Sequence, residues 1–250
     1  MRHGNNQDTV MMKIPDVETL LNARGQTRKR YFPGKYTVIS SGIINDEDLS
    51  KLRWTRELLA VKCFGPEYHI PIDYPYYGDM PEKERKANLR KMMSGAKWMA
   101  QQLSNTETEI IPLIKGYSPE ERSICYEAIR KIKPEYCAIY GSQYFGGSMG
   151  NGINKLNRHI REIISEVGIE NILLIGPQYK NGVEKLPPEV KATAGQRSWI
   201  KKSKLREVPI PVAHSRYLDW RSEIESALGQ GQATIKSAIR QSSKVAAPGS

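Results

Sequence analysis

Residues 110–152 constrain the fold of this chain more than any other stretch of the sequence. They read IIPLIKGYSPEERSICYEAIRKIKPEYCAIYGSQYFGGSMGNG, which is an apolar run, a helical pattern over 119–132, a second apolar run and a loop with five glycines. Short apolar runs that alternate with helices predict βαβ units and a parallel sheet. Ligands bind at the carboxyl ends of such strands. We therefore expect Lys115 and the turn 141–143 to lie side by side in a site.

Apolar runs and helical patterns alternate along most of the chain. Strands are expected at 35–41, 69–73, 110–115, 136–140, 169–176 and 190–195, and a weaker one at 207–212, where two prolines favour an edge strand or an extended loop. Helices are expected at 16–22, 45–63, 81–103, 119–132, 153–167 and 220–241. In the helix at 81–103, apolar residues at three- and four-residue spacing are expected to face the core: Leu89, Met92, Met93, Ala96, Met99 and Leu103.

Six or seven strands alternating with helices favour an α/β fold, and within it a TIM-like (β/α) barrel, complete or partial, over an open doubly wound sheet. No GxGxxG or GxxxxGK[ST] string follows the first two strands, which argues against a dinucleotide or nucleoside triphosphate site. We expect the barrel to occupy residues 35–228. Residues 1–34 read as a polar lead-in, and residues 229–250 as a C-terminal helix and a disordered tail.

The net charge of +11 favours a polyanionic partner, most simply nucleic acid. The alternative is a basic but otherwise ordinary soluble protein. The basic segment RGQTRKR at 24–30 would either grip phosphates or form an exposed loop, and the glycine-rich loop 141–152 would either cradle a phosphate or act as a lid. No apolar run approaches the ~20 residues that a membrane span needs, and the N-terminus lacks the apolar core of a secretory signal.

The cysteines and histidines indicate the compartment and argue against a metal. Cys63, Cys125 and Cys137 are widely separated, no CxxC pair occurs, and the four histidines are scattered. This pattern predicts reduced thiols in a cytoplasmic protein rather than a disulfide framework or a zinc site. We expect no metal and no cofactor.

Five strings resemble a known family by their order and by their position at strand ends: IPIDYP, IPLIKGYSPEE, AIYGSQYFGG, ILLIGPQY and ATAGQRSW. Over about residues 35–200 the chain is similar to the tRNA-guanine transglycosylases, and looks closest to their relatives that place 7-deazaguanine bases in DNA. The resemblance implies a (β/α) barrel that exchanges a guanine for a deazapurine through a covalent sugar–enzyme intermediate. One aspartate of these enzymes is the nucleophile, and a second assists as acid/base.

The resemblance carries several residue roles over to this chain. Asp73 matches the aspartate that hydrogen-bonds the base, the turn 141–143 matches the one whose backbone amides contact the purine, and Lys115 stands where the family usually has a glutamine. The plainer alternatives are that Asp73 forms a turn and that Lys115 pairs with it. The catalytic candidates are Asp73 and Ser40, and the substrate-binding candidates are Lys115, Gly116, Gly141, Ser142, Gln143, Tyr144, Gln196 and Arg197. Tyrosines beside these positions (Tyr74, Tyr76, Tyr77, Tyr140 and Tyr144) would stack on bases or pack under loops.

The two catalytic aspartates of the family have no counterpart here. Ser40 stands at the acid/base position, and Gly195, four residues before Trp199, stands at the position of the nucleophile. Glycine offers no nucleophile, and a serine without a base is a poor substitute for a carboxylate. The zinc-binding cysteine cluster of the tRNA enzymes is also missing. Asp73, Asp46 or Asp48 would have to supply the lost acids in a changed geometry.

The leading hypothesis is a transglycosylase (pentosyltransferase)-like protein that exchanges or recognises a guanine or 7-deazaguanine base in nucleic acid. The partner would be DNA or tRNA, with DNA favoured because the chain has neither a zinc motif nor a separate RNA-binding appendage. A purine flipped from the stack would be read by Asp73. The alternative is a non-catalytic nucleic-acid-binding accessory protein on the same barrel. A third interpretation is a small-molecule lyase in which Lys115 forms an imine.

Overall fold

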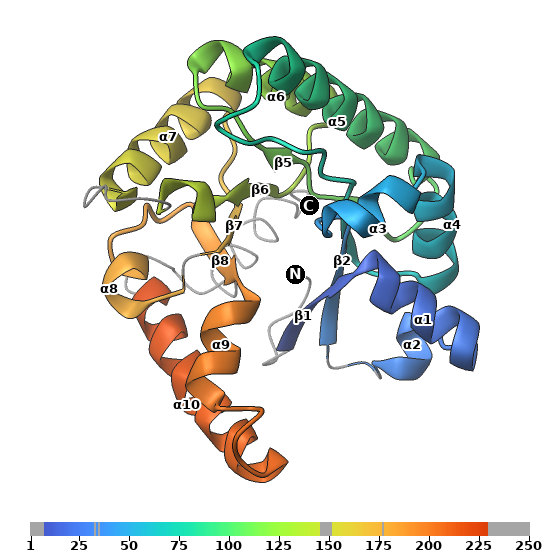
Figure 1. The fold of residues 1–250 in the computed structure, drawn as a ribbon, viewed down its shortest axis with the longest axis vertical. Coiled ribbons are helices and arrows are strands. Elements are labelled where there is room, and N and C mark those ends of the chain that lie inside the picture. The colour runs from blue at the N-terminus through green and yellow to red at the C-terminus, as the bar shows by residue number, and fades with distance from the viewer. Residues whose placement is uncertain (1–7, 33, 35, 146–151, 177, 230–250) are drawn as a thin grey trace, which may run out of the picture. The chain divides into compact units, whose positions relative to one another are not determined.

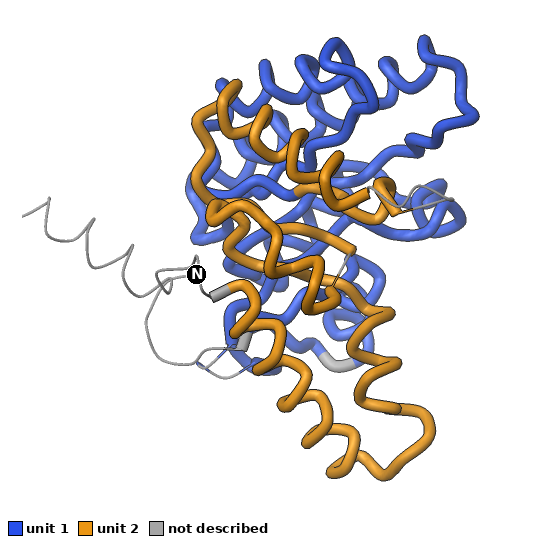
Figure 2. Tube along the Cα trace, turned by 90° about the vertical axis from the view of Figure 1, so that its left-hand side faces the viewer, with its two compact units in different colours: residues 1–138 blue, residues 139–250 orange. Residues whose placement is uncertain are grey.

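The computed structural model of this chain describes all residues except 1–7, 33, 35, 146–151, 177 and 230–250 (Figure 1). The chain divides into two compact units, residues 1–138 and 139–250 (Figure 2). The structure is mixed α/β, with two four-stranded parallel sheets whose strand orders are β1-β2-β3-β4 and β5-β6-β7-β8. The expected α/β class and parallel pairing are therefore confirmed.

Unit 1 alternates strands and helices. Its strands are β1 (Asp8–Lys13), β2 (Tyr36–Ser41), β3 (Tyr68–Ile70), β4 (Glu109–Ile110) and β5 (Leu113–Ile114), followed by the start of β6 (Cys137–Tyr140). Its helices are α1 (Ile14–Arg24), α2 (Arg28–Tyr31), α3 (Asp46–Lys51), α4 (Trp54–Phe64), α5 (Glu82–Gln102) and α6 (Pro119–Ile132). In the first sheet, Ser40 of β2 lies opposite His69 of β3.

The core of unit 1 is built from the apolar faces of α1, α4 and α5 and the apolar side chains of β2 and β4. On α5 the expected core positions are almost completely buried, with exposed fractions of 1–3% for Leu89, Met92, Met93, Ala96, Met99 and Leu103. The periodicity of this helix therefore predicted its packing correctly. Side chains at three- and four-residue spacing share one helical face, and burying that face holds the helix in place.

Unit 2 begins within β6 and continues with η1 (Gly141–Tyr144), a single turn of 3₁₀ helix. Its remaining elements are α7 (Gly152–Val167), β7 (Ile172–Ile175), α8 (Lys180–Val183), β8 (Val190–Ala194), α9 (Gln196–Ser203) and α10 (Ile210–Gly229). Strands β7 and β8 pair in parallel, with Ile175 opposite Ala194. A small cluster of Val183, Trp220 and Ile224 packs α8 against α10.

Several expected element boundaries are wrong. Residues 207–212 form no strand, because Pro209 and Pro211 lie at the start of α10, where a missing N–H leaves no hydrogen bond unmade. The apolar run after Glu109 is two strands of different sheets, separated at Pro112. The expected helix over 45–63 is interrupted at Leu52, whose backbone is extended.

The N-terminal region contains more structure than its polar composition indicated. Residues 8–13 form β1, which pairs in parallel with β2 along its whole length. The expected helix after Pro15 is present as α1, and Gly25 ends it in the left-handed conformation. The expected C-terminal tail, and the part of the predicted helix beyond residue 229, lie outside the described residues.

Two further expectations concern thiols and membranes. The three cysteines are free thiols, exposed at Cys63 and buried at Cys125 and Cys137. None of the helices in the described part of the chain combines the length and apolar character that a membrane crossing requires.

Candidate functional site

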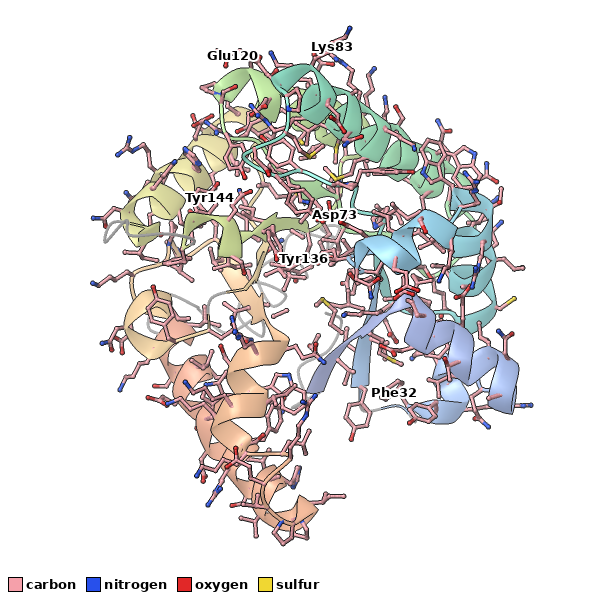
Figure 3. The ribbon with its side chains drawn as sticks, viewed as in Figure 1. Phe32, Asp73, Lys83, Glu120, Tyr136 and Tyr144 are labelled. Atoms are coloured by element: carbon pink, nitrogen blue, oxygen red, sulfur yellow. The ribbon has the colours of Figure 1, made fainter. Side chains whose placement is uncertain are left out.

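Asp73 lies just beyond the carboxyl end of β3, on the chain that leads to α5 (Figure 3). Backbone hydrogen bonds extend the pairing of β2 and β3 past their ends: the N–H of Gly42 donates to the carbonyl of Ile70 (2.7 Å), and that of Asp73 donates to the carbonyl of Gly42 (3.3 Å). A Cβ atom at Gly42 would come within 2.6 Å of both Ile72 N and Glu57 Oε1. The absence of a side chain at Gly42 therefore allows this close approach.

Asp73 and Lys115 form a buried ion pair. The Lys115 ammonium contacts Asp73 Oδ1, and the two side chains are only 7% and 13% exposed, respectively. Burial raises the pKa of the Asp73 carboxyl above its ordinary value, the neighbouring Lys115 opposes the rise, and Asp46 adds to it. The carboxyl ends of the strands therefore hold a desolvated carboxylate that faces one cation.

Gly116, the residue after Lys115, is fixed by α6. Its φ of 145° lies in a region that favours glycine, and a Cβ there would be 2.7 Å from Arg122 N. The Arg122 guanidinium donates to the Gly116 carbonyl (3.1 Å), and the Cys125 thiol donates to the Lys115 carbonyl (3.5 Å). These contacts hold the backbone that carries the Lys115 side chain.

Ser40 belongs to a buried chain of three polar side chains. Its Oγ lies 2.8 Å from His69 Nδ1, and His69 Nε2 lies 3.1 Å from Glu57 Oε1. In the neutral Nε2–H tautomer of His69, Ser40 donates to the ring and the ring donates to Glu57. Glu57 Oε2 has no hydrogen-bond partner among the described residues.

A serine, a histidine and a carboxylate in sequence are also the parts of a hydrolytic triad. Here Ser40, His69 and Glu57 are 0%, 0% and 1% exposed, so no substrate reaches the serine. These three side chains therefore form an internal polar network that links β2, β3 and α4. Sequence reasoning missed His69 and Glu57, although Glu57 shares the buried face of α4 with Ala60, Val61 and Phe64, and a carboxylate on an apolar face needs a partner.

Of the candidate stacking tyrosines in unit 1, two make internal contacts and one has an exposed ring. Tyr76 is buried and stacks on Tyr117, with ring centroids 4.9 Å apart, and its hydroxyl donates to Glu121 (2.6 Å). Tyr74 accepts a hydrogen bond from the Trp54 indole (2.9 Å). Tyr77, by contrast, is 50% exposed. Its exposed ring fits a stacking role better than the ring of Tyr76 does.

The basic segment at 24–30 is partly used in internal contacts. Arg28 forms an ion pair with Glu67 (2.5 Å), and its Nε donates to the Gly65 carbonyl (3.1 Å). Lys29 lies 3.9 Å from Glu107. At Arg28 the structure therefore favours a local tether over the phosphate-gripping interpretation.

In unit 2 the turn 141–144 packs on the end of β7. Gly141 and Tyr144 are buried, Gln143 is half-buried and Ser142 is exposed. The Tyr144 hydroxyl lies 2.9 Å from His159 Nδ1 of α7, and a Cβ at Gly176 would collide with Ser142. Tyr144 (Figure 3) thus anchors the turn rather than offering its ring for stacking. Residues 146–151 of the glycine-rich loop lie outside the described residues.

Gly195, where the transglycosylase resemblance implies a nucleophile, is crowded by other atoms of unit 2. Gly195 follows β8, and a Cβ there would lie 2.7 Å from the Gly176 carbonyl oxygen and 2.9 Å from Gln178 Oε1. Gln178 is buried and its amide donates to the Thr193 carbonyl (3.2 Å). Gln196 and Arg197 are exposed in the first turn of α9.

The predicted site residues therefore fall into two sets. Unit 1 brings Asp73 and Lys115 together and encloses Ser40, whereas residues 141–144, Gln196 and Arg197 belong to unit 2. Within the described ranges, no group of three or more His, Cys, Asp and Glu side chains is arranged to hold a metal ion. Comparisons of the sequence with models of known families and with curated proteins found no match.

Proposed function

We propose that this chain is a nucleic-acid-binding protein that recognises a guanine-like base through Asp73 without exchanging it. The buried Asp73 carboxylate at the strand ends of unit 1 carries the proposal. A carboxylate accepts hydrogen bonds from the ring N–H and the exocyclic amine of guanine, and 13% of this side chain remains exposed. The net charge of +11 supports a polyanionic partner.

Base exchange through a covalent intermediate would need a nucleophile and an acid/base, and the surroundings of the corresponding positions argue against both. Ser40 is completely buried and already hydrogen-bonded to His69. At Gly195 two oxygen atoms occupy the space that a nucleophilic side chain would enter. These two observations favour the non-catalytic alternative over the transglycosylase reaction, and nothing in the surroundings of Lys115 favours imine chemistry, since its ammonium is paired with Asp73.

The (β/α) barrel expected from the sequence is part of this proposal. The described residues contain two parallel sheets of four strands each, and eight parallel strands are the number that a complete barrel uses. In that arrangement the guanine-like base would meet Asp73 just beyond the carboxyl end of β3. DNA remains favoured over tRNA as the source of the base.

The test compares the binding of oligonucleotides that differ at one base. Wild-type protein should prefer a strand with a single guanine over the same strand with inosine, which lacks the exocyclic amine. Asp73→Asn should reduce this preference about 10-fold, because one carboxylate acceptor becomes a donor and the hydrogen bond from the guanine amine to a charged group is worth ~1.5–3 kcal/mol. Asp219→Asn, a change at an exposed aspartate of α10, should leave it unchanged.

Two outcomes would overturn the proposal. An unchanged preference in a folded Asp73→Asn variant, checked by thermal unfolding, would remove Asp73 from base recognition. Stable incorporation of radiolabelled guanine or 7-deazaguanine into DNA or tRNA by the wild-type protein would show that the chain is an exchange enzyme after all.

A further inference from the structure

A groove between α5 and α6 has no role in the site described above. It has a volume of about 460 Å³ and lies within unit 1, where these two helices pack against each other (Figure 1). Its residues occupy one face of each helix, because they recur at three- and four-residue spacing. The α5 wall consists of Lys86, Arg90, Met93, Ser94 and Lys97, and the α6 wall consists of Glu120, Ser123, Ile124, Glu127, Ala128 and Lys131.

The groove is positively charged, and the charge is unevenly distributed. Four cationic side chains and two carboxylates line it, and three of the cations lie in a row on α5. From Lys86 to Lys97 this row extends for ~16 Å at 1.5 Å per residue. One strand of duplex DNA carries a phosphate every ~3.4 Å of helix axis, so this length corresponds to about five phosphates of a duplex strand.

Most of these cations are available to a ligand. Lys86 pairs with Glu82 one turn earlier. Arg90, Lys97 and Lys131, in contrast, have no carboxylate partner within the described part of the chain. Arg90 and Lys131 are exposed, Lys97 is half-buried, and the apolar side chains of Met93 and Ala128 are buried beneath them. The exposed Ser94 hydroxyl adds a donor of the kind that contacts phosphate oxygens, whereas the Ser123 hydroxyl donates to the Glu120 carbonyl (2.8 Å).

We infer that the α5–α6 groove binds the sugar–phosphate backbone of the nucleic acid, with the strand following the row of cations on α5. The inference rests on the proposed nucleic acid partner and names the surface that holds it. The contacts are with phosphates, so this surface adds affinity without reading sequence. The carboxylates Glu120 and Glu127 would repel the strand from their part of the α6 wall and keep it against α5, which leaves Lys131 as the α6 cation that contacts phosphate.

The test uses a triple variant, Arg90→Gln, Lys97→Gln and Lys131→Gln, and a single-stranded oligonucleotide whose bases have been replaced by abasic sites. Binding should weaken at least about 10-fold at 0.1 M salt. The slope of log K against log salt should become less steep by about 2, because each lost phosphate contact on a single strand contributes ~0.7. The matched control, Lys62→Gln, Lys201→Gln and Lys202→Gln, removes the same charge at exposed positions outside the groove and should change affinity less than about threefold.

The abasic strand separates this inference from the proposed function. If the two triple variants lose affinity equally, the charge acts diffusely and the groove assignment is wrong. If the groove variant alone loses affinity while Asp73→Asn keeps the guanine preference, the groove stands and base recognition fails. Wild-type protein that ignores the abasic strand but binds a phosphopeptide or anionic vesicles through these residues would overturn the nucleic acid assignment. A thermal unfolding curve confirms that each variant is folded.

Discussion

At the scale of single residues, the backbone around Gly195 lies close to two oxygen atoms, the Gly176 carbonyl and the Gln178 side-chain carbonyl. A Cβ at 2.7 Å and 2.9 Å from them is nearer than real Cβ atoms come to other heavy atoms. Gln178 cannot simply turn away at no cost, because it is buried and its amide is hydrogen-bonded to the Thr193 carbonyl. The aspartate that the transglycosylase resemblance implies at this position would meet both oxygens.

Gly195→Asp should therefore destabilise the protein and restore no chemistry. We expect a loss of ~1–3 kcal/mol in the free energy of unfolding from overpacking, measured by urea denaturation, and a further loss from carboxylate–oxygen repulsion. Gly195→Ala isolates the steric part, so the difference between the two variants gives the electrostatic part. An unchanged urea midpoint for Gly195→Asp, or a covalent nucleic acid adduct trapped on it, would contradict this account.

The ion pair between Asp73 and Lys115 could be anticipated from the sequence, because both residues follow apolar runs and parallel strands gather their carboxyl ends on one side. The partners of Ser40 could not. His69 and Glu57 come from elements 29 and 17 residues further along the chain, and nothing in local spacing shows that their side chains meet. Only the position of Glu57 on the apolar face of α4 signalled a buried partner.

At the scale of elements, α6 begins at a capping box that also serves its packing. Ser118 accepts a hydrogen bond from the Glu121 N–H (3.2 Å), and Glu121 accepts one from the Ser118 N–H (3.2 Å). Glu121 additionally accepts from Tyr76, Arg85 and the Tyr117 N–H. Burial would raise the pKa of Glu121, but hydrogen bonds from Tyr76 and Arg85 outweigh it and hold that pKa below the ordinary value.

Replacing these two residues should have unequal effects on stability. Ser118→Ala removes one cap and should cost ~1 kcal/mol of unfolding free energy. Glu121→Gln should cost more, about 2–3 kcal/mol at pH 7, because hydrogen bonds to a buried charge are lost. Since the folded-state pKa is lowered, this stabilisation is present above pH 4.5 and disappears as the pH falls below it.

Urea denaturation of wild type and Glu121→Gln between pH 3 and pH 7 checks this pH dependence. The difference in unfolding free energy between the two proteins should shrink toward acid pH. Glu127→Gln, at an exposed position of the same helix, provides the matched control and should change stability by less than about 0.5 kcal/mol. If the stability difference between wild type and Glu121→Gln grows as the pH falls, the pKa of Glu121 in the folded state is raised and not lowered.

Long periodic helices such as α5 and α6 were predictable because their buried faces repeat over several turns. Short strands were not. β4 and β5 have two residues each and are divided by Pro112, so their apolar run reads as one strand. β1 (DTVMMK) lacks clear alternation, and its pairing with β2 depends on a partner that lies 28 residues away. Tertiary pairing, rather than local preference, decides such segments.

At the scale of the whole molecule, the alternation of apolar runs and helical patterns predicted the α/β class but not the division into two units. The boundary between residues 138 and 139 falls inside β6, whose residues Cys137, Ala138 and Ile139 are all apolar and buried. No change in composition and no run of glycine or proline marks it. A boundary of this kind depends on which distant segments contact each other, and a single sequence does not report that.

The reactivity of the three thiols measures whether the core of unit 1 stays inaccessible to solvent. Cys63 is exposed, whereas Cys125 and Cys137 are completely buried in unit 1. Burial also raises the pKa of the Cys125 thiol to about 11, and raises that of Cys137 as well, so neither forms the reactive thiolate at pH 8.

At pH 8 an aromatic disulfide reagent should therefore modify one thiol per chain rapidly and all three in guanidinium. Cys63→Ser should abolish the rapid reaction, and the slow reaction of the other two thiols then reports the opening of unit 1. Rapid modification of two or three thiols in the native protein would mean that this core is not closed. The groove between α5 and α6 belongs to the same unit, so the same measurement applies to the triple groove variant. If its buried thiols react at the wild-type slow rate, its lost affinity comes from the missing cations and not from a loosened fold.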